Sequence, residues 1–188
     1  ESFILVVKPT SRMEGFRVST STLEDDQGNV IDNANITIRK VEYVRVRKPT
    51  DSYGFAGWWP DPLPLYEQSE TLYPAENQAF WVTVKVPADA KAGDYSGNLR
   101  LSSGAWNFSV PVRLHVWNFT LPHTPSVRSG FGFSLGGVKN YDNLRTPEEE
   151  KEAFDYYMQA FRDYKISPYN PFQLSPIREE VTGVAWEG

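Results

Sequence analysis

Five aromatic residues lie close together in a stretch of the sequence that is rich in glycine and proline. They are Tyr53, Phe55, Trp58, Trp59 and Tyr66. Pyranose sugars present C–H groups to the faces of indole rings, so Trp58 and Trp59 are candidate substrate-binding residues. We favour the alternative, in which a loop this aromatic buries its rings for stability, over one end of its own domain or at a domain interface.

The sequence offers few residues that could form a metal site or a nucleophilic active site. It contains two histidines and no cysteine, which excludes a thiolate zinc site and a cysteine nucleophile. No acidic residue stands at ligand spacing around His115 or His123, so we expect both histidines to be structural, with no metal and no cofactor. The serine-hydrolase motif Gly-x-Ser-x-Gly is also absent.

Charge and hydropathy exclude two further classes of partner. The 19 Lys and Arg residues are outnumbered by 24 Asp and Glu residues, giving a net charge of -5. This is the wrong sign for a protein that binds phosphates, so we expect no nucleic acid partner. No apolar run reaches the roughly 20 residues of a membrane span. The first residues lack the basic segment of a signal peptide, so we expect that an export signal has been removed and that the protein is secreted, periplasmic or at the cell surface.

Alternating apolar residues predict antiparallel β-structure up to about residue 122. The clearest strand is 106–116, where every second residue is apolar. Pro111 cannot donate to a β-ladder, so this strand should lie at a sheet edge or contain a bulge. Further strands are expected at residues 3–8, 16–22, 80–86 and 95–101. A longer strand at 35–47 should be either buried on parts of both faces or broken by a bulge near Arg39. Turn residues at 26–29 and 102–104 predict hairpin loops.

Tyr95 makes this β-rich pattern more specific. It follows Gly93 by two residues at the start of a predicted strand. In immunoglobulin-like sandwiches a tyrosine at such a corner holds the preceding turn through its hydroxyl group. The alternative is an ordinary β-turn whose tyrosine packs on the core. We predict an immunoglobulin-like antiparallel β-sandwich over residues 1–122.

After a proline-containing linker at 123–128 the pattern changes to strand, helix, strand. Thr146 is a predicted N-cap, Pro147 fits the first helical position, and Glu149 completes a capping box. Apolar strands are expected on both sides, the first ending at a pair of glycines, Gly136 and Gly137, with no helix directly after it.

A strand–helix–strand unit begins a parallel sheet. A (β/α)₈ barrel needs about 250 residues, so we expect residues 129–188 to be an incomplete start of such a barrel. Barrels bind ligands where their strands end. Tyr169 and Asn170 follow the second predicted strand, where Tyr169 could stack on a sugar and Asn170 could donate to a hydroxyl group. Both residues could equally form a turn before Pro171.

Three segments carry a resemblance to a known family. Residues 86–97 (VPADAKAGDYSG), 110–122 (VPVRLHVWNFTLP) and 131–133 (FGF) resemble the N-terminal β-sandwich and the start of the barrel in bacterial enzymes of glycoside hydrolase family 123. The PDPL segment at 60–63 is similar to a loop of the same proteins. The founding activity of this family is β-N-acetylgalactosaminidase.

The resemblance implies a substrate-assisted mechanism. The acetamido oxygen of the sugar attacks the anomeric carbon, an Asp orients the amide, and the adjacent Glu protonates the leaving oxygen. The family's Asp-Glu pair lies in later barrel strands, and the dipeptide Asp-Glu occurs nowhere in this sequence. The nearest acidic groups, at 24–26, 148–150 and 179–180, fit solvated surface charge better. We therefore predict no catalytic residue and no activity in this chain by itself.

These observations lead to one main hypothesis and two alternatives. The main hypothesis is the accessory β-sandwich and barrel start of an exported bacterial glycoside hydrolase that acts on amino-sugar-containing glycans. Its partners would be the glycan substrate and the rest of its own barrel. The first alternative is a non-catalytic carbohydrate-binding module that uses Trp58 and Trp59. The second is a structural adhesion or sensor sandwich, in which the apolar face of the predicted helix, with Phe154, packs on the sandwich.

Overall fold

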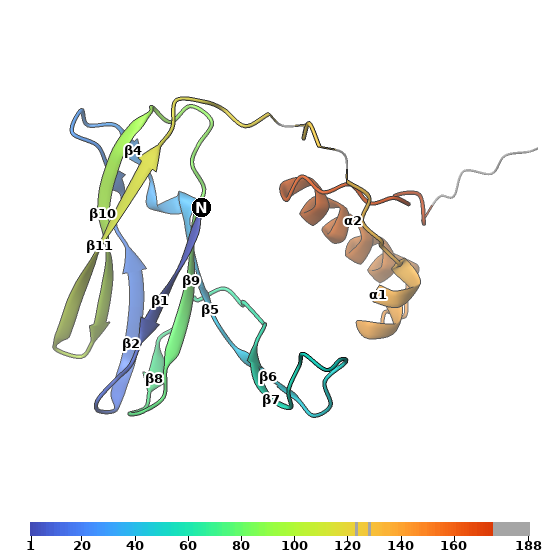
Figure 1. Ribbon diagram of the computed structural model, residues 1–188, viewed down its shortest axis with the longest axis horizontal. Helices are drawn as coiled ribbons and strands as arrows, with labels where there is room; N and C mark the ends of the chain where they lie inside the picture. Colours follow the sequence, from blue (N-terminus) through green and yellow to red (C-terminus); the bar gives the residue numbers. More distant parts are fainter. Residues whose placement is uncertain (123, 128, 175–188) are drawn as a thin grey trace, which may run out of the picture. The chain divides into compact units, whose positions relative to one another are not determined.

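The computed structural model (Figure 1) describes residues 1–122, 124–127 and 129–174. The chain divides into two units, Glu1–Thr120 and a second unit that begins at Leu121. The first unit is built from antiparallel strands and the second contains two α-helices. The described part of the chain is thus mainly β-structure with few helices, as the sequence predicts. None of its helices is long and apolar enough to cross a membrane.

The first unit contains eleven strands arranged in three sheets. The strands are β1 (Ser2–Val7), β2 (Met13–Thr20), β3 (Leu23–Glu24), β4 (Val30–Ile31), β5 (Ile36–Lys40), β6 (Tyr43–Val46), β7 (Gly57–Pro60), β8 (Glu70–Leu72), β9 (Gln78–Val84), β10 (Gly93–Ser103) and β11 (Trp106–Val116). A three-stranded sheet has the order β1-β9-β5. In a six-stranded sheet, β10 pairs with β11 along one edge and with β2 and then β3 along the other, while β8 pairs with β2 and β4 pairs with β3. Strands β6 and β7 form a separate two-stranded sheet.

The two larger sheets share one hydrophobic core. Phe80 and Val82 of β9 pack against Phe16 of β2 and Leu99 of β10, and all four are almost fully buried. Alternation of side chains along each strand places these residues on the inner faces. Each such side chain contributes about 1.5–3 kcal/mol by leaving water, so this core holds the sheets together.

Strand β11 agrees with its sequence pattern and β5 does not. Strand β11 spans the predicted residues 106–116 and pairs only with β10, so Pro111 lies on an edge strand as expected. The prediction of one strand over 35–47, buried on parts of both faces or broken by a bulge near Arg39, is wrong, because these residues form two strands in different sheets. Strand β5 keeps a regular register with β9 through Arg39 and ends at Lys40. After the buried Val41, the chain leaves the sheet and enters β6, which pairs with β7 instead.

Tyr95 holds the turn before β10. Its hydroxyl group donates a 2.9 Å hydrogen bond to the carbonyl oxygen of Lys91. The side chain is 2% exposed, in a cluster with Leu23 and Ile31. Burial raises the pKa of Tyr95, and the charge of Asp25 adds to this effect. The predicted role of the hydroxyl group is therefore confirmed.

Gly97 lies where β10 changes partners along one edge. Strand β2 pairs with β10 at residues 99–102, and β3 pairs with it at Ser96. Between the two, the chain at Thr22 and Leu23 comes so close that a Cβ atom at Gly97 would lie 2.5 Å from both the Thr22 carbonyl oxygen and Leu23 Cδ2. Only glycine leaves room for this close approach of backbone and core side chain.

The second unit contains α1 (Leu135–Tyr141) and α2 (Pro147–Asp163). The capping box predicted for α2 is present, because Thr146 Oγ1 accepts from Glu149 N and Glu149 Oε2 accepts from Thr146 N. Phe131, which precedes α1, forms a parallel bridge with Pro168, which follows α2. This is the direction that the strand–helix–strand prediction requires.

Two predictions for the second unit need correction. The expected strands around Phe131 and Pro168 are reduced to this single bridge. Gly136 and Gly137 do not follow a strand but belong to helix α1. The reason is that Ser134 Oγ accepts a hydrogen bond from Gly137 N, which makes Ser134 an N-cap and starts a helix despite the two glycines.

The apolar side of α2 packs on the segment before α1. The ring of Phe133 lies 5.9 Å from Phe154, 5.3 Å from Tyr157 and 5.9 Å from Phe161, measured between ring centroids. The helix therefore packs next to the parallel bridge of its own unit.

Replacement of Tyr95 by phenylalanine should destabilise the first unit. The variant Tyr95→Phe keeps the buried ring but removes the hydrogen bond to the Lys91 carbonyl group, so the free energy of unfolding should fall by about 1 kcal/mol in urea titrations. The control is Tyr53→Phe, whose side chain is 96% exposed. Equal stability of the two variants would show that Tyr95 acts only through ring packing.

Replacement of Gly97 by alanine should be more damaging than its size suggests. The new methyl group would collide with the Thr22 carbonyl oxygen and Leu23, so we expect a loss of about 1–3 kcal/mol of unfolding free energy. The control is Ser109→Ala at an exposed position of β11, which should change stability by less than about 0.5 kcal/mol. If Gly97→Ala had the same stability as the unmodified chain, this would contradict the close approach of Thr22 and Leu23 to β10.

Candidate functional site

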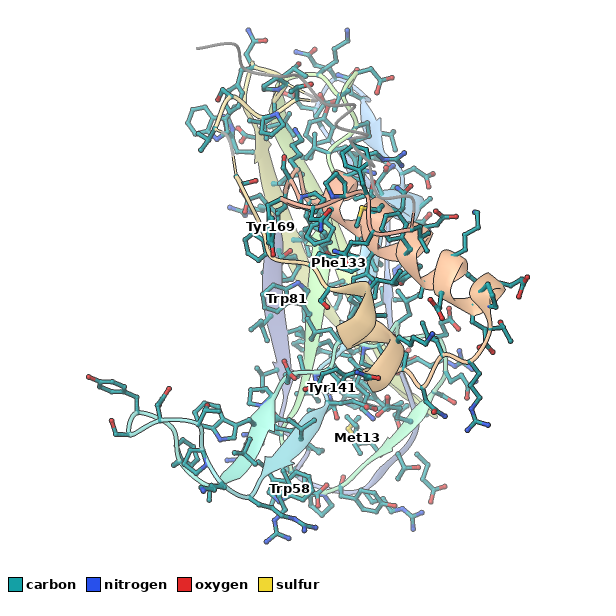
Figure 2. The ribbon with its side chains drawn as sticks, turned by 90° about the vertical axis from the view of Figure 1, so that its right-hand side faces the viewer. Met13, Trp58, Trp81, Phe133, Tyr141 and Tyr169 are labelled. Carbon is teal, nitrogen blue, oxygen red and sulfur yellow. The ribbon has the colours of Figure 1, made fainter. Side chains whose placement is uncertain are left out.

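The aromatic segment is a β-hairpin and not the loop that the sequence analysis describes. Strands β6 and β7 pair in the register Tyr43↔Pro60, Val44↔Trp59, Arg45↔Trp58 and Val46↔Gly57. Figure 1 shows this hairpin standing apart from the two larger sheets, and Figure 2 shows Trp58 on it. The sequence conceals the hairpin because its two short strands are separated by ten residues and flanked by glycine and proline.

The register places Trp58 and Trp59 on opposite faces of the hairpin. Neighbouring residues of a strand point to opposite sides, and directly paired residues point to the same side. Trp58 therefore shares a face with Arg45 and Tyr43, and Trp59 shares the other face with Val44. The two indole rings do not form one continuous platform.

Trp59 is tied into the structure of the hairpin. Its Nε1 donates a 2.9 Å hydrogen bond to the Phe55 carbonyl oxygen, and its ring lies 4.4 Å from the Phe55 ring. The connecting segment is also held by Asp51 Oδ1, which accepts from Tyr53 N and Gly54 N. These contacts give Trp59 a structural role within the hairpin, while Tyr53, Phe55 and Trp58 are exposed and not buried as the favoured alternative supposes.

The Trp58 side chain is accessible for contact with another molecule. Its side chain is 65% exposed, and its indole N–H donates to none of the described residues. Arg45, directly opposite, is exposed too. This face therefore presents two exposed aromatic rings, Trp58 and Tyr43, next to one guanidinium group.

Tyr66 belongs to the core and not to the aromatic surface. Its hydroxyl group donates a 2.8 Å hydrogen bond to the Phe16 carbonyl oxygen, and its ring packs edge-on against Phe80 at 4.9 Å. Burial, with a contribution from the charge of Glu70, raises the pKa of Tyr66 to about 12. The phenol therefore stays neutral and keeps this hydrogen bond far above neutral pH.

Tyr169 and Asn170 lie in the second unit, directly after the parallel bridge. The Tyr169 backbone N–H donates to the Phe131 carbonyl oxygen at 3.0 Å, and its side chain is 72% exposed (Figure 2). The Asn170 side chain is exposed and bonds to none of the described residues. Both are thus at the strand end, where a barrel would bind its ligand.

Gln173 organises this strand end, and the sequence analysis missed it. Its Nε2 donates to the carbonyl oxygens of Phe133 and Asn170, at 2.6 and 3.2 Å, while its Oε1 accepts from Leu135 N at 2.7 Å. One amide side chain thereby links the ends of both bridge segments and the start of α1. No local sequence signal marks it, because its partners are backbone groups about forty residues away or in its own turn.

Asp25 and Glu149, from two of the acidic groups noted in the sequence, do not have the environment of a general acid. Hydrogen bonds from Asn29, first from its side chain, lower the pKa of Asp25, and backbone hydrogen bonds from Arg145 and Thr146 lower the pKa of Glu149. A general acid at neutral pH needs a raised pKa. Asp25 and Glu149 are therefore explained by a turn and a helix cap, while residues 179–180 lie outside the described part.

His115 contacts one carboxylate and one aromatic ring. His115 Nδ1 lies 2.6 Å from Asp94 Oδ1, and its ring packs edge-on against Trp117 at 4.6 Å. These contacts fit a structural residue. In the described ranges no group of three or more His, Asp or Glu residues could hold a metal ion. His123 is not among the described residues.

Comparison with known proteins identifies a matching family and a similar solved structure. The model of the glycoside hydrolase 123 N-terminal domain matches residues 2–103. Among solved structures, the chain is similar to a family 123 glycoside hydrolase from Clostridium perfringens, whose structural analysis concerned glycolipid glycan hydrolysis, with a TM-score of 0.75 and 16% sequence identity. The similarity covers 88% of this chain and 30% of that chain. A search of the curated proteins found no match.

Removal of the Trp59 ring should open the hairpin loop without unfolding the core. The variant Trp59→Ala loses a hydrogen bond and a ring contact to Phe55, together worth about 2 kcal/mol of local stability. Trypsin cleavage after the exposed Arg47 should then become up to roughly thirtyfold faster, as measured by mass spectrometry of the fragments. Trp58→Ala should leave this rate unchanged, and equal acceleration by both variants would contradict the structural role of Trp59.

Proposed function

The chain belongs to the glycoside hydrolase 123 N-terminal domain family, and on this premise we propose that it is the accessory β-domain and barrel start of an exported bacterial glycoside hydrolase. Its substrates would be glycans that contain amino sugars. The similar Clostridium perfringens structure supports the glycan class, because its published description concerns glycolipid glycan hydrolysis. The composition, with 6 Trp, 10 Tyr and 14 Pro, is the basis for proposing an exported protein.

In this proposal the first unit is an immunoglobulin-like β-sandwich that braces the enzyme. Two antiparallel sheets with a shared core support this description, together with the hydrogen bond from Tyr95 to Lys91. Its function would be mechanical: it supports the catalytic domain and shapes one wall of the cleft. Trp59, held by its contacts to Phe55, would keep the β6–β7 hairpin rigid for this purpose.

The second unit would supply the first strands of a (β/α)₈ barrel. The observation that carries this step is the parallel bridge between Phe131 and Pro168, with the intervening α2 packed on Phe133. In a barrel, the segment after each strand faces the substrate. Tyr169 and Asn170 would therefore contact the glycan, with Gln173 as the positioning residue.

Catalysis itself would depend on residues outside this sequence. A substrate-assisted hydrolysis needs one carboxyl group to orient the acetamide and one to protonate the leaving oxygen. The sequence contains no Asp-Glu dipeptide, and Asp25 and Glu149 have lowered pKa values that suit hydrogen-bond acceptors. The chain by itself would position and support, and the remainder of the barrel would perform the chemistry.

Hydrolysis of an aryl β-N-acetylgalactosaminide tests this function. The 188-residue chain should release no aryl alcohol, and the protein produced from the whole reading frame should release it with retention of the anomeric configuration, because the acetamide attacks first. Product stereochemistry is read by NMR at early time points. A whole-frame protein that hydrolyses none of the aryl N-acetylhexosaminides would overturn the proposal.

The same assay separates a substrate contact from a structural tyrosine. In the whole-frame protein, Tyr169→Ala should lower kcat/KM several-fold. The matched control is Tyr156→Ala, since Tyr156 on α2 is similarly exposed, at 76% against 72% for Tyr169. Equal activity of the two variants would remove Tyr169 from the substrate site.

A further inference from the structure

We propose that one face of the β6–β7 hairpin binds an anionic glycan. Trp58 would stack on a sugar ring, and Arg45, assisted by Arg47 and Lys48, would bind a carboxylate or sulfate group of the same chain. The choice of a glycan rests on the proposed function. The site itself requires only residues of the first unit.

The β-register brings the aromatic and the cationic group together. Arg45 and Trp58 are directly paired, so their side chains leave the same face of the hairpin with Cβ atoms about 5 Å apart. Tyr43 and Pro60 form the next pair on this face. A pyranose ring lying on the indole would thus have a guanidinium group at its edge, within reach of an acidic substituent.

The cations of this segment have no anionic partner in the described structure. Arg45, Arg47 and Lys48 form no ion pair with any described residue, although the chain has a net charge of -5. Of the acidic residues nearby, Glu42 pairs with Lys40 at 3.7 Å and Asp51 accepts hydrogen bonds from Tyr53 N and Gly54 N, while Asp61 forms no ion pair with any of these three cations. Three cations within four residues are left to attract an external anion.

The arrangement is also prepared for binding before a ligand arrives. Trp59 anchors the connecting segment from the opposite face, through Phe55, so Trp58 is exposed on a strand whose partner is fixed. Little ordering is needed on association, which favours affinity. Arginine can hold a carboxylate or sulfate with two parallel hydrogen bonds, which a neutral hydroxyl group cannot match.

Calorimetric titration of the whole 188-residue chain with four probes tests the site. Chondroitin 4-sulfate tetrasaccharide presents sulfate and carboxylate groups, unsulfated chondroitin tetrasaccharide presents carboxylates only, and the N-acetylglucosamine tetramer is neutral. A single-stranded oligonucleotide of matched charge represents another polyanion. We expect one or both chondroitin probes to bind at least about tenfold more tightly than the neutral tetramer, with affinity falling as salt is added. The better chondroitin probe shows whether sulfate or carboxylate is preferred.

Variants identify the residues. Arg45→Gln should weaken binding of the better probe about tenfold and Trp58→Ala about fivefold or more, whereas Arg45→Lys and Trp58→Tyr should retain part of the affinity. The controls are Arg113→Gln and Trp106→Ala, an exposed cation and an exposed indole on β11, which should bind like the unmodified chain. Circular dichroism and urea unfolding show that each variant is folded.

Four results would overturn the proposal. They are equal affinity for the neutral tetramer, tighter binding of the oligonucleotide than of either chondroitin, unchanged affinity in both Arg45→Gln and Trp58→Ala, and no binding of any glycan at millimolar concentration. None of these results bears on hydrolysis by the whole-frame protein. Failure of this site and failure of the proposed function are therefore distinguishable.

Discussion

The first unit depends on the close approach of three strands at the centre of its larger sheet. Strand β10 pairs with β11 along one side and with β2 and then β3 along the other. The change from β2 to β3 brings Thr22 and Leu23 onto the position where residue 97 would carry a side chain. Glycine there lets Leu23 enter the core beside Tyr95 and Ile31. The absence of a side chain at residue 97 therefore makes room for the second core cluster, in which Leu23 and Ile31 pack with Tyr95.

The β6–β7 hairpin is stabilised by different contacts from the rest of the first unit. Its residues contribute little to the shared core, since Trp58, Tyr43 and Val44 are all exposed. Its conformation is fixed instead by short-range contacts, above all those of Trp59 with Phe55. A surface that is rigid but not needed for the core is free to carry a binding function, because exposed side chains can vary at little cost to stability.

The second unit shows how few contacts define the start of a parallel arrangement. One bridge between Phe131 and Pro168, the packing of α2 on Phe133 and the amide of Gln173 set the direction of its two extended segments. Parallel strands with helices on only one side leave apolar surface uncovered. Phe131 and Phe172 are both more than half exposed.

The sequence by itself determined the features that are local in the chain. The bounds of β11, the capping box of α2 and the hydroxyl contact of Tyr95 each depend on residues within a few positions of one another, so their side-chain pattern identifies them. The pairing of β6 with β7, which is known only from the tertiary structure, places Trp58 and Trp59 on opposite faces and Arg45 beside Trp58. The tertiary structure also decided that Gln173 joins segments distant in sequence. The physical reason is that strand pairing and backbone hydrogen bonds between distant segments depend on which segments meet in space, and a single sequence carries no local record of that choice.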